Sequence, residues 1–125
     1  KILINDGQPM IHGDGDQSRD FTFIDNVVHA NLLAARCTKP LGGEVVNVAC
    51  GRAVTINELA TKMARALDKR QKVEHGPPRA GDVKHSLADL TRVRALISYQ
   101  PIVDFERGLE QTMDWYSSVM VGPSR

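Results

Sequence analysis

The sequence predicts a small mixed α/β domain of about four helices and three or four short strands. Three observations lead to this prediction. Apolar residues recur at helical spacing in several windows, short apolar or β-branched runs lie between these windows, and turn residues separate the two kinds of segment. The chain has 125 residues, one domain's worth, and its hydrophobic content of 42% is ordinary for a globular protein.

The first part of the chain is expected to be extended and rich in turns. Residues 1–7 are typical of the last turn of a helix that stops at a glycine, so we expect the chain to begin inside a longer element. Residues 10–12 form a short extended run, and the glycine-rich residues 13–18 form a turn. Residues 21–24 are aromatic and β-branched, which favours a strand.

A helix and a buried strand are expected next. Asp25 can cap the helix, which should end before Pro40. Residues 44–49 are rich in valine and are expected to form a strand that is buried on both faces near its middle. The expected apolar face of the helix consists of Val28, Leu32 and Ala35.

The clearest helix follows a capping box. The Thr55 hydroxyl and the Glu58 carboxylate can each accept a hydrogen bond from a free amide of the first turn. Residues 72–75 read as a short strand, and residues 76–82 must be a loop because they contain paired prolines and flanking glycines. The apolar face of this helix consists of Ile56, Leu59, Ala60, Met63, Ala64 and Leu67.

Two further helices are expected near the end of the chain. Asp89 and Asp104 can cap them, and Pro101 separates them. We expect Trp115 and Tyr116 to lie in the core rather than to stack on bases, because no basic stripe accompanies them. The apolar positions are Leu90, Val93 and Ile97 in the first helix and Phe105, Leu109, Met113 and Tyr116 in the second.

Composition excludes several classes of protein. A net charge of +1 gives no broad attraction to nucleic acid or anionic membranes. Cys37 and Cys50 lack metal-ligand or redox spacing and are expected to be buried free thiols in a reducing compartment. No apolar run approaches the roughly 20 residues needed to span a bilayer, and no signal-peptide pattern opens the chain. We therefore expect a cytoplasmic protein.

Two arginines are candidates for phosphate binding. Arg19 follows the glycine-rich turn, and Arg79 lies in the proline-rich loop. A guanidinium can bind two phosphate oxygens at once, so a converging pair would suit a diphosphate. Asp82 accepts hydrogen bonds and would suit vicinal ribose hydroxyls. The alternative for Arg19 is a weak salt bridge within the turn, to Asp16 or Asp20.

The sequence contains no pattern typical of a metal site, a dinucleotide site or a catalytic tyrosine and lysine pair. The Gly-Asp-Gly-Asp turn has neither a P-loop nor an EF-hand pattern, and the four histidines lack metal-ligand spacing. No G-x-x-G-x-x-G run follows a strand, so no dinucleotide site is expected. Neither tyrosine has a lysine four residues later: Val103 follows Tyr99 at that spacing, and Met120 follows Tyr116. No catalytic, cofactor-binding or metal-binding residue is therefore assigned.

Four blocks of the sequence resemble the nucleotide-sugar epimerase and dehydratase family, within the extended short-chain dehydrogenases. They occur in the family's order and cover nearly the whole chain. The forms R-D-F-x-x-I-x-N-x-V-x-A-N-L-L-A-A and G-D-V-x-H-S-L-A-D look most similar to UDP-N-acetylglucosamine and UDP-glucose or glucuronate 4-epimerases. Ser98 departs from the family, which usually has a glycine at the end of that helix. The blocks are residues 13–25, 47–59, 78–89 and 99–116.

The resemblance implies that substrate binding and catalysis lie in different domains of the family fold. Residues 1–125 would be the C-terminal part that binds a UDP-sugar, with Arg19 and Arg79 on the diphosphate and Asp82 on the ribose. The family's Rossmann domain, which holds NAD and the catalytic Ser/Thr, Tyr and Lys, would be absent from this chain. The chain would then be inactive alone and would cover an exposed apolar face with that domain or by self-association. The alternatives are a non-catalytic binding or interaction module from a truncated gene, or the same part of a 4,6-dehydratase or decarboxylase.

Overall fold

The computed structural model describes residues 2–3, 5, 7–69 and 73–120. Within these residues the chain forms a mixed α/β fold of four helices and four short strands, which confirms the predicted fold class. The elements, in chain order, are β1 (Met10–His12), β2 (Ser18–Arg19), α1 (Ile24–Arg36), β3 (Val54–Thr55), α2 (Ile56–Ala66), β4 (Glu74–Gly76), α3 (Thr91–Ile97) and α4 (Phe105–Met120).

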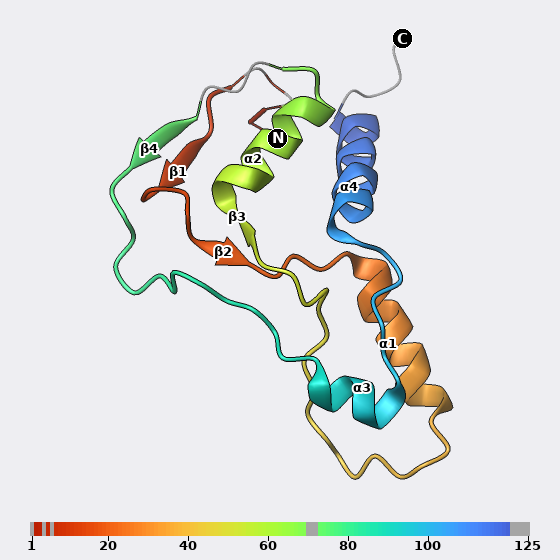
Figure 1. Cartoon of the computed structure of the whole chain (residues 1–125). Coiled ribbons are helices and arrows are strands. Elements are labelled where there is room, and N and C mark those ends of the chain that lie inside the picture. The colour runs from red at the N-terminus through yellow and green to blue at the C-terminus, as the bar shows by residue number, and fades with distance from the viewer. Residues whose placement is uncertain (1, 4, 6, 70–72, 121–125) are drawn as a thin grey trace.

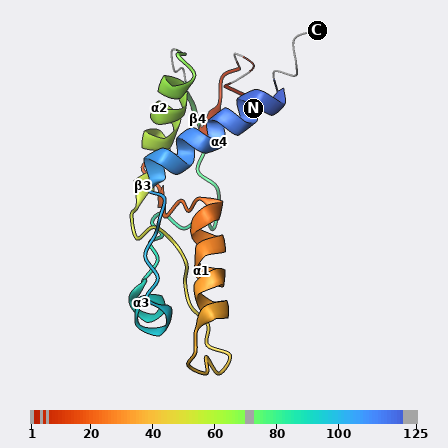
Figure 2. The same ribbon diagram turned by 90° about the vertical axis from the view of Figure 1, so that its right-hand side faces the viewer.

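The elements gather into two groups at opposite ends of an elongated molecule (Figures 1 and 2). One group holds the strands with α2 and α4, which pack against each other. The other group holds α1 packed against α3. The long segment between β4 and α3 runs from the first group to the second, so its residues can contact both β1 and β2.

Two pairs of strands hold the first group together. β1 pairs in parallel with β4, with Met10 opposite Glu74, and β2 pairs antiparallel with β3, with Ser18 opposite Thr55. Ser18 also forms a parallel bridge with His85 on its other edge. Its N–H donates to the carbonyl oxygen of Lys84 at 2.8 Å. The loop after β4 is thereby fixed beside β2.

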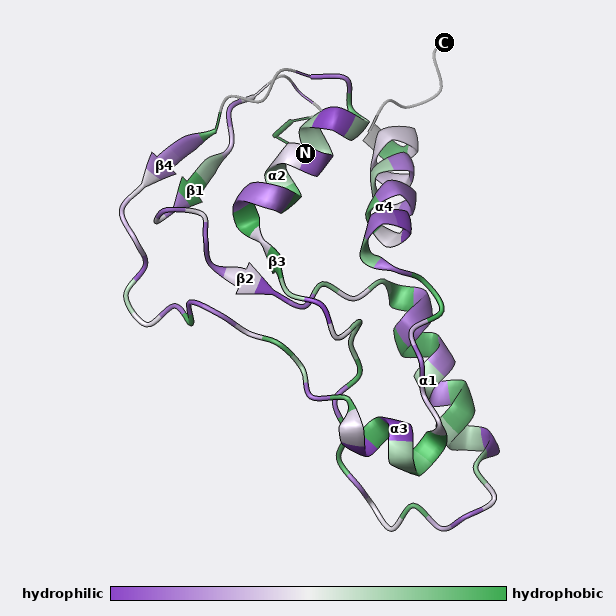
Figure 3. Cartoon of the chain, viewed as in Figure 1, coloured by the Kyte–Doolittle hydropathy of each residue, from purple (hydrophilic) through white to green (hydrophobic). Residues whose placement is uncertain are grey.

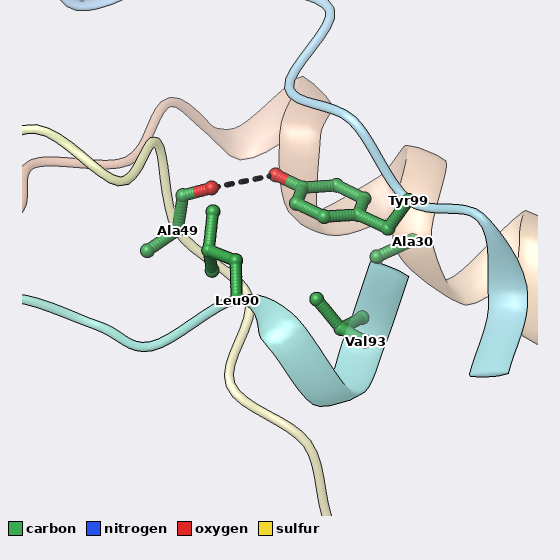
Figure 4. Packing of buried hydrophobic residues seen from close by; sticks show 5 residues of the cluster. All are labelled: Ala30, Ala49, Leu90, Val93 and Tyr99. Atoms are coloured by element: carbon green, nitrogen blue, oxygen red, sulfur yellow. Dashed lines mark hydrogen bonds between the residues drawn. The ribbon is translucent and has the colours of Figure 1, made fainter. Parts of the chain in front are cut away.

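The hydrophobic core of the second group surrounds Tyr99 (Figure 4). Tyr99 is fully buried, and its hydroxyl donates to the carbonyl oxygen of Ala49 at 3.0 Å. Burial is the main cause that raises the pKa of this phenol. The other buried members of the cluster are Ala30, Ala49, Leu90 and Val93.

A buried amide joins α1 to the segment before α4. The Asn26 side chain is fully buried, and its Oδ1 accepts from the N–H groups of Ile102 and Val103 at 2.8 and 2.9 Å. Its Nδ2 donates to the Val103 carbonyl oxygen at 2.7 Å. A buried amide must be paired to be tolerated, so this set of bonds accounts for a polar residue in the core. Periodicity of apolar residues did not predict it.

Helix α2 follows the prediction with one exception. The Thr55 hydroxyl accepts from the Glu58 N–H at 3.0 Å, which confirms the N-cap, and Ala60 and Ala64 lie buried on the predicted face. The Glu58 carboxylate, however, binds the Arg52 guanidinium at 3.2 Å and lies within 3.7 Å of the Lys62 ammonium. The reciprocal half of the capping box is therefore replaced by ion pairs.

The predicted strand at residues 21–24 is wrong. The strand lies earlier, at Ser18–Arg19, and α1 already begins at Ile24, with Phe23 rather than Asp25 at the N-cap position. Residues 21–23 pack on α4 instead: the rings of Phe21 and Phe105 lie 5.8 Å apart, and a Cβ on Gly108 would meet the Phe23 Cβ at 2.7 Å. Aromatic and β-branched content alone did not separate this packing from strand pairing.

The predicted apolar face of α1 is also wrong, because it faces solvent. Val28 and Leu32 are 50% and 47% exposed and Ala35 is exposed, whereas Asn26 and Ala30 are the buried positions. The hydropathy of this helix is visible in Figure 3.

Residues 44–49 form no strand within the described part of the chain, because no described strand pairs with them, and Val45 is largely exposed. Both features leave apolar surface uncovered.

Asp104 caps α4 as expected, because its Oδ1 accepts from the Arg107 N–H at 2.8 Å. In α3 the N-cap position is Leu90 rather than Asp89, although Asp89 Oδ1 accepts from the Thr91 N–H at 2.8 Å. Helix α3 ends at Ser98, which adopts the left-handed conformation with φ of 55°. In α4, Phe105, Leu109 and Met113 face inward, whereas Trp115 and Tyr116 are exposed, which corrects their expected place in the core.

Several smaller expectations have mixed outcomes. Cys37 and Cys50 are free but only half-buried, and burial raises the pKa of the Cys50 thiol, with Asp20 adding to it. The strand expected at residues 72–75 is observed as β4, and residue 72 lies outside the described residues. At the start, Gly7 N–H donates to the Ile2 carbonyl oxygen at 2.9 Å, the spacing of a helix-ending turn, while residues 1, 4 and 6 lie outside the described set.

Candidate functional site

Three predicted binding residues come from two segments that the fold brings together. Arg19 is the second residue of β2, and Arg79 and Asp82 lie in the segment between β4 and α3. The bridge between Ser18 and His85 holds these segments side by side. The Ser18 hydroxyl and His85 Nδ1 also lie 3.0 Å apart, which adds a side-chain contact to the same junction.

The Arg19 guanidinium is held mainly by Asp82. Nη2 donates to Asp82 Oδ1 at 2.6 Å, and Nη1 donates to the carbonyl oxygens of Ser18 and Lys84 at 2.8 and 3.3 Å. The alternative prediction, a salt bridge within the turn, is wrong, because the partner carboxylate lies 63 positions further along the chain. Arg19 and Asp82 therefore form one unit of the site.

Arg79 and Asp82 lie at the two ends of a tight turn. The Asp82 N–H points at the Arg79 carbonyl oxygen at 3.3 Å, and Gly81 at the third position has φ of 79°. A positive φ at this position is the geometry of a type II turn and favours glycine. The sequence Arg-Ala-Gly-Asp is therefore well suited to bring the two charged side chains to the same part of the surface.

The turn borders an open cavity of about 370 Å³ between β1, β4 and the glycine-rich turn. Arg79, Asp82 and Lys84 line it on one side. Within the described residues, no hydrogen bond or ion pair engages the exposed Arg79 guanidinium. The rest of the lining consists of His12, Gly13, Asp14, Gln17, Gly76 and Pro78.

Arg19 lines a neighbouring hollow rather than this cavity. The second hollow has a volume of about 520 Å³, and Arg19 shares it with residues of the 46–49 and 86–88 segments. Asp82 connects the two, since it lines the first cavity and binds Arg19. The structure thus brings both arginines to Asp82. Their convergence on one diphosphate remains a prediction.

The glycine-rich turn forms the opposite wall of the cavity. The Asp14 carboxylate accepts from the Asp16 N–H at 3.0 Å and lies 3.2 Å from the Lys84 ammonium, and these two contacts hold the pKa of Asp14 below its ordinary value. Gly15 passes so close to Asn57 that a Cβ would lie 2.0 Å from the amide oxygen. Gly15 also has φ of 78°, a backbone conformation that favours glycine, and a Cβ there would force the Asn57 side chain to move.

Asp20 has a positioning role that sequence reasoning missed. Its carboxylate accepts from the N–H groups of Cys50 at 3.0 Å, Gly51 at 2.9 Å and Ala88 at 3.4 Å. Three chain segments thus meet at the residue next to Arg19. The only signal in the sequence was the adjacency of Asp20 to Arg19, which suggested a salt bridge instead.

A separate apolar hollow of about 290 Å³ lies between the 21–24 segment, α2 and α4. Phe21, Phe23 and Phe105 line it together with Leu59 and Leu109, so it offers no charged group to a ligand. In the described part of the chain, no cluster of histidine, cysteine and acidic side chains is suited to a metal ion. No helix among these residues has the length and apolarity to cross a membrane.

Comparison with known proteins gives consistent matches. The profile of the GDP-mannose 4,6 dehydratase family matches residues 1–112. UDP-glucuronate 4-epimerase of Thermodesulfobacterium geofontis is 34% identical over 106 residues, which are 84% of this chain and 32% of that protein.

Two solved structures match the fold closely. The UDP-glucose 4-epimerase of Thermotoga maritima with UDP-glucose has a TM-score of 0.86 at 31% identity, and the match covers 94% of this chain and 37% of that one. A UDP-N-acetylglucosamine 4-epimerase of Methanobrevibacter ruminantium in complex with UDP-N-acetylmuramic acid has a TM-score of 0.85 at 38% identity, with 95% and 37% covered. The chain therefore spans about a third of the length of these relatives.

Proposed function

Because the chain belongs to the NAD-dependent nucleotide-sugar epimerase and dehydratase family, we propose that it is the UDP-sugar-binding portion of a nucleotide-sugar 4-epimerase. Arg79 and Arg19 bind the diphosphate, and Asp82 binds the ribose. The observation that supports this most directly is the turn from Arg79 to Asp82, which presents an unengaged guanidinium beside an open cavity.

The chemistry of the three side chains suits a sugar nucleotide. A guanidinium donates to two phosphate oxygens at once, which fixes the orientation of a diphosphate as well as its position. Asp82 Oδ1 binds Arg19, which leaves Oδ2 to accept from a ribose hydroxyl. The ion pair thereby orients the carboxylate before the ligand arrives, and a group that is oriented in advance loses less entropy on binding.

These residues anchor and orient, and they perform no bond-breaking step. They lie toward the nucleotide rather than the reacting carbon of the sugar, so the same site would serve a 4-epimerase, a 4,6-dehydratase or a decarboxylase. What they supply to catalysis is a fixed position of the substrate against the groups that react. The comparison with UDP-sugar 4-epimerases favours the first of the three activities.

The described residues do not fit NAD. A dinucleotide site uses a glycine-rich turn that leads from a parallel strand into a helix, whose N-terminus binds the pyrophosphate. Here the parallel pair is β1 with β4, and the glycine-rich turn after β1 leads into β2. We assign no NAD contact and no catalytic residue to this chain. Turnover of UDP-N-acetylglucosamine by the pure chain with added NAD would refute that assignment.

The exposed face of α1 and residues 44–49, which pair with no described strand, support a second part of the proposal. Both expose apolar groups that a further domain of the family fold would cover, or that a second copy would cover when the chain is alone. A non-catalytic interaction module would use the same surface. Binding of a sugar nucleotide separates the two functions, because an interaction module needs no ligand in the Arg79 cavity.

Calorimetric titration with UDP-glucose tests the proposed function. We expect weak binding by the chain and a loss of at least about tenfold in Arg79→Ala, since a charge-assisted contact to phosphate contributes about 1.5–3 kcal/mol. Arg107→Ala is the matched control, because Arg107 is also exposed but lies on α4. The control should stay within about twofold of the original chain. Equal binding by the original chain and Arg79→Ala, or no binding by either, would contradict the proposal.

A further inference from the structure

We propose that Lys84 is an additional phosphate-binding residue of the cavity beside Arg79. Without ligand its ammonium pairs with the Asp14 carboxylate, and the phosphates of a nucleoside diphosphate replace that carboxylate as its acceptors. The inference rests on the proposed function, because it assumes that the cavity beside Arg79 receives a diphosphate. It assigns a role to a lysine that the sequence patterns did not single out.

The backbone places the Lys84 side chain at the cavity. The Lys84 carbonyl oxygen accepts from the Ser18 N–H at 2.8 Å and from Arg19 Nη1 at 3.3 Å. The residue is therefore fixed against β2 on its main-chain side, while its side chain lines the cavity together with Arg79 and Asp82. The ammonium lies 3.2 Å from Asp14 Oδ2 on the opposite wall.

The charges around the cavity sum to a positive value only when this lysine is counted. Arg79, Asp82 and Lys84 line one side of it and Asp14 lies on the opposite wall, while Arg19 binds Asp82 from outside. With Lys84, the three cations (Arg19, Arg79 and Lys84) exceed the two carboxylates of Asp14 and Asp82. Without it, cations and carboxylates would cancel, and each phosphate of the ligand would still bring a negative charge close to Asp14. His12 also lines the cavity, with Nδ1 3.3 Å from the Pro77 carbonyl oxygen.

The pair between Lys84 and Asp14 is weak enough to be exchanged. The two side chains are 62% and 58% exposed, and ion pairs of that exposure contribute little to stability. Asp14 is also held by the Asp16 N–H at 3.0 Å, so its carboxylate stays in place when the ammonium leaves. Phosphate oxygens can then replace the carboxylate as acceptors for a lysine that acts as a mobile point charge.

A simpler role for Lys84 would be to neutralise Asp14 without touching the ligand. The two roles differ in a double-mutant cycle with Lys84→Gln and Asp14→Asn. If Lys84 only neutralises Asp14, the glutamine variant should lose nothing once Asp14 carries no charge. If Lys84 binds phosphate, the loss should persist in the Asp14→Asn background.

Titration with UDP and with uridine, at fixed salt concentration, performs this test. We expect Lys84→Gln to weaken UDP binding about threefold to tenfold in both backgrounds and to leave uridine binding unchanged. Asp14→Asn alone should strengthen UDP binding, because it releases the ammonium. All substituted side chains are exposed, and thermal unfolding of each variant verifies the fold.

Each other outcome overturns a defined part of the inference. Full recovery of UDP binding in the double variant would reduce Lys84 to a neutralising group and refute the phosphate contact. An unchanged UDP affinity in Lys84→Gln, with a loss in Arg79→Ala, would refute the role of Lys84 and leave the proposed function standing. Absence of UDP binding by the original chain would refute the proposed function and this inference with it.

Discussion

Arg19 and Asp82 form an ion pair of 2.6 Å although 63 positions separate them in the chain. The pair joins the end of β2 to the turn that carries Arg79. It uses one carboxylate oxygen, so the other is available to a ligand. Both proposed subsites, for phosphate and for ribose, therefore depend on one contact between two distant segments.

Replacement of Asp82 by Asn should reduce the preference of the site for UDP over 2′-deoxy-UDP. The amide keeps the size of the side chain but loses the charge that accepts from vicinal hydroxyls and pairs with Arg19. We expect Asp82→Asn to weaken UDP binding about threefold to tenfold and 2′-deoxy-UDP binding by less, since that ligand lacks one hydroxyl. Competition titrations measure the ratio, and the exposed Asp114→Asn on α4 is the control. Equal losses for both ligands would exclude the ribose contact.

Replacement of Ser98 by Gly should stabilise the fold. Ser98 ends α3 with φ of 55°, a conformation that costs a residue with a Cβ about 1–2 kcal/mol and that glycine adopts freely. Part of this gain is offset because glycine is more flexible in the unfolded chain. We expect the free energy of unfolding in urea to rise by about 0.5–1 kcal/mol.

The matched control for Ser98 is replacement by alanine. Alanine removes the hydroxyl but keeps the Cβ, so it should give no gain. Equal stabilisation by Ser98→Ala and Ser98→Gly would show that the hydroxyl, rather than the left-handed backbone, limits stability at this position.

Local signals in the sequence predicted helices better than strands. Thr55 and Asp104 cap their helices through their own side chains, and the face of α2 around Ala64 depends on helical spacing alone. A strand depends on a partner that can lie anywhere in the chain. Residues 21–23 have strand-like composition but pack on α4, and residues 44–49 find no described partner. Composition therefore could not place either segment.

The candidate site was predictable as residue types but not as an arrangement. Gly81 marks the turn that joins Arg79 to Asp82, and that turn is local. The partner of Arg19 was missed because it is brought there by the bridge between Ser18 and His85. Lys84 was missed for the same reason, since its role depends on Asp14 across the cavity.

The stability of the fold should decrease in alkaline solution through Tyr99 and Cys50. Burial raises the pKa of both groups, from ordinary values of 10.0 and 9.0. A folded-state pKa above the unfolded value means that the protonated form is favoured in the folded chain. The contribution to stability is therefore complete below pH 9 and is lost as pH rises through the folded-state pKa values.

Tyr99→Phe tests the tyrosine part of that dependence. At neutral pH the variant should lose about 1 kcal/mol, because the buried Ala49 carbonyl oxygen would lose the donor that Tyr99 gives it. Its unfolding free energy should then fall less steeply than that of the original chain as pH rises above 10.0, the ordinary pKa of tyrosine. Urea unfolding at several pH values measures both effects. Tyr116→Phe, at an exposed position, is the control, and parallel pH curves for Tyr99→Phe and the original chain would contradict the prediction.

The exposed row on α1 makes a prediction about assembly. Val28 and Leu32 are one turn apart and half exposed, with Ile24 one turn before them, so they form a continuous apolar strip on the solvent side of the helix. Residues 44–49 add the exposed side chain of Val45 and pair with no strand in the described part of the chain. Surfaces of this kind are usually covered by another domain or another chain.

We therefore expect the isolated chain to form a dimer or larger species at micromolar concentration, measured by sedimentation velocity. A variant with Val28→Glu and Leu32→Glu should shift toward the monomer, because association would bury two uncompensated carboxylates. Its free energy of unfolding should change little, since both positions are half exposed in the single chain. Thr38→Glu with Ser118→Glu adds the same charge at other exposed positions and should leave association unchanged. If the original chain is a monomer at every concentration, the prediction is contradicted. If the α1 variant and the control variant dissociate equally, net charge rather than the apolar strip on α1 governs assembly.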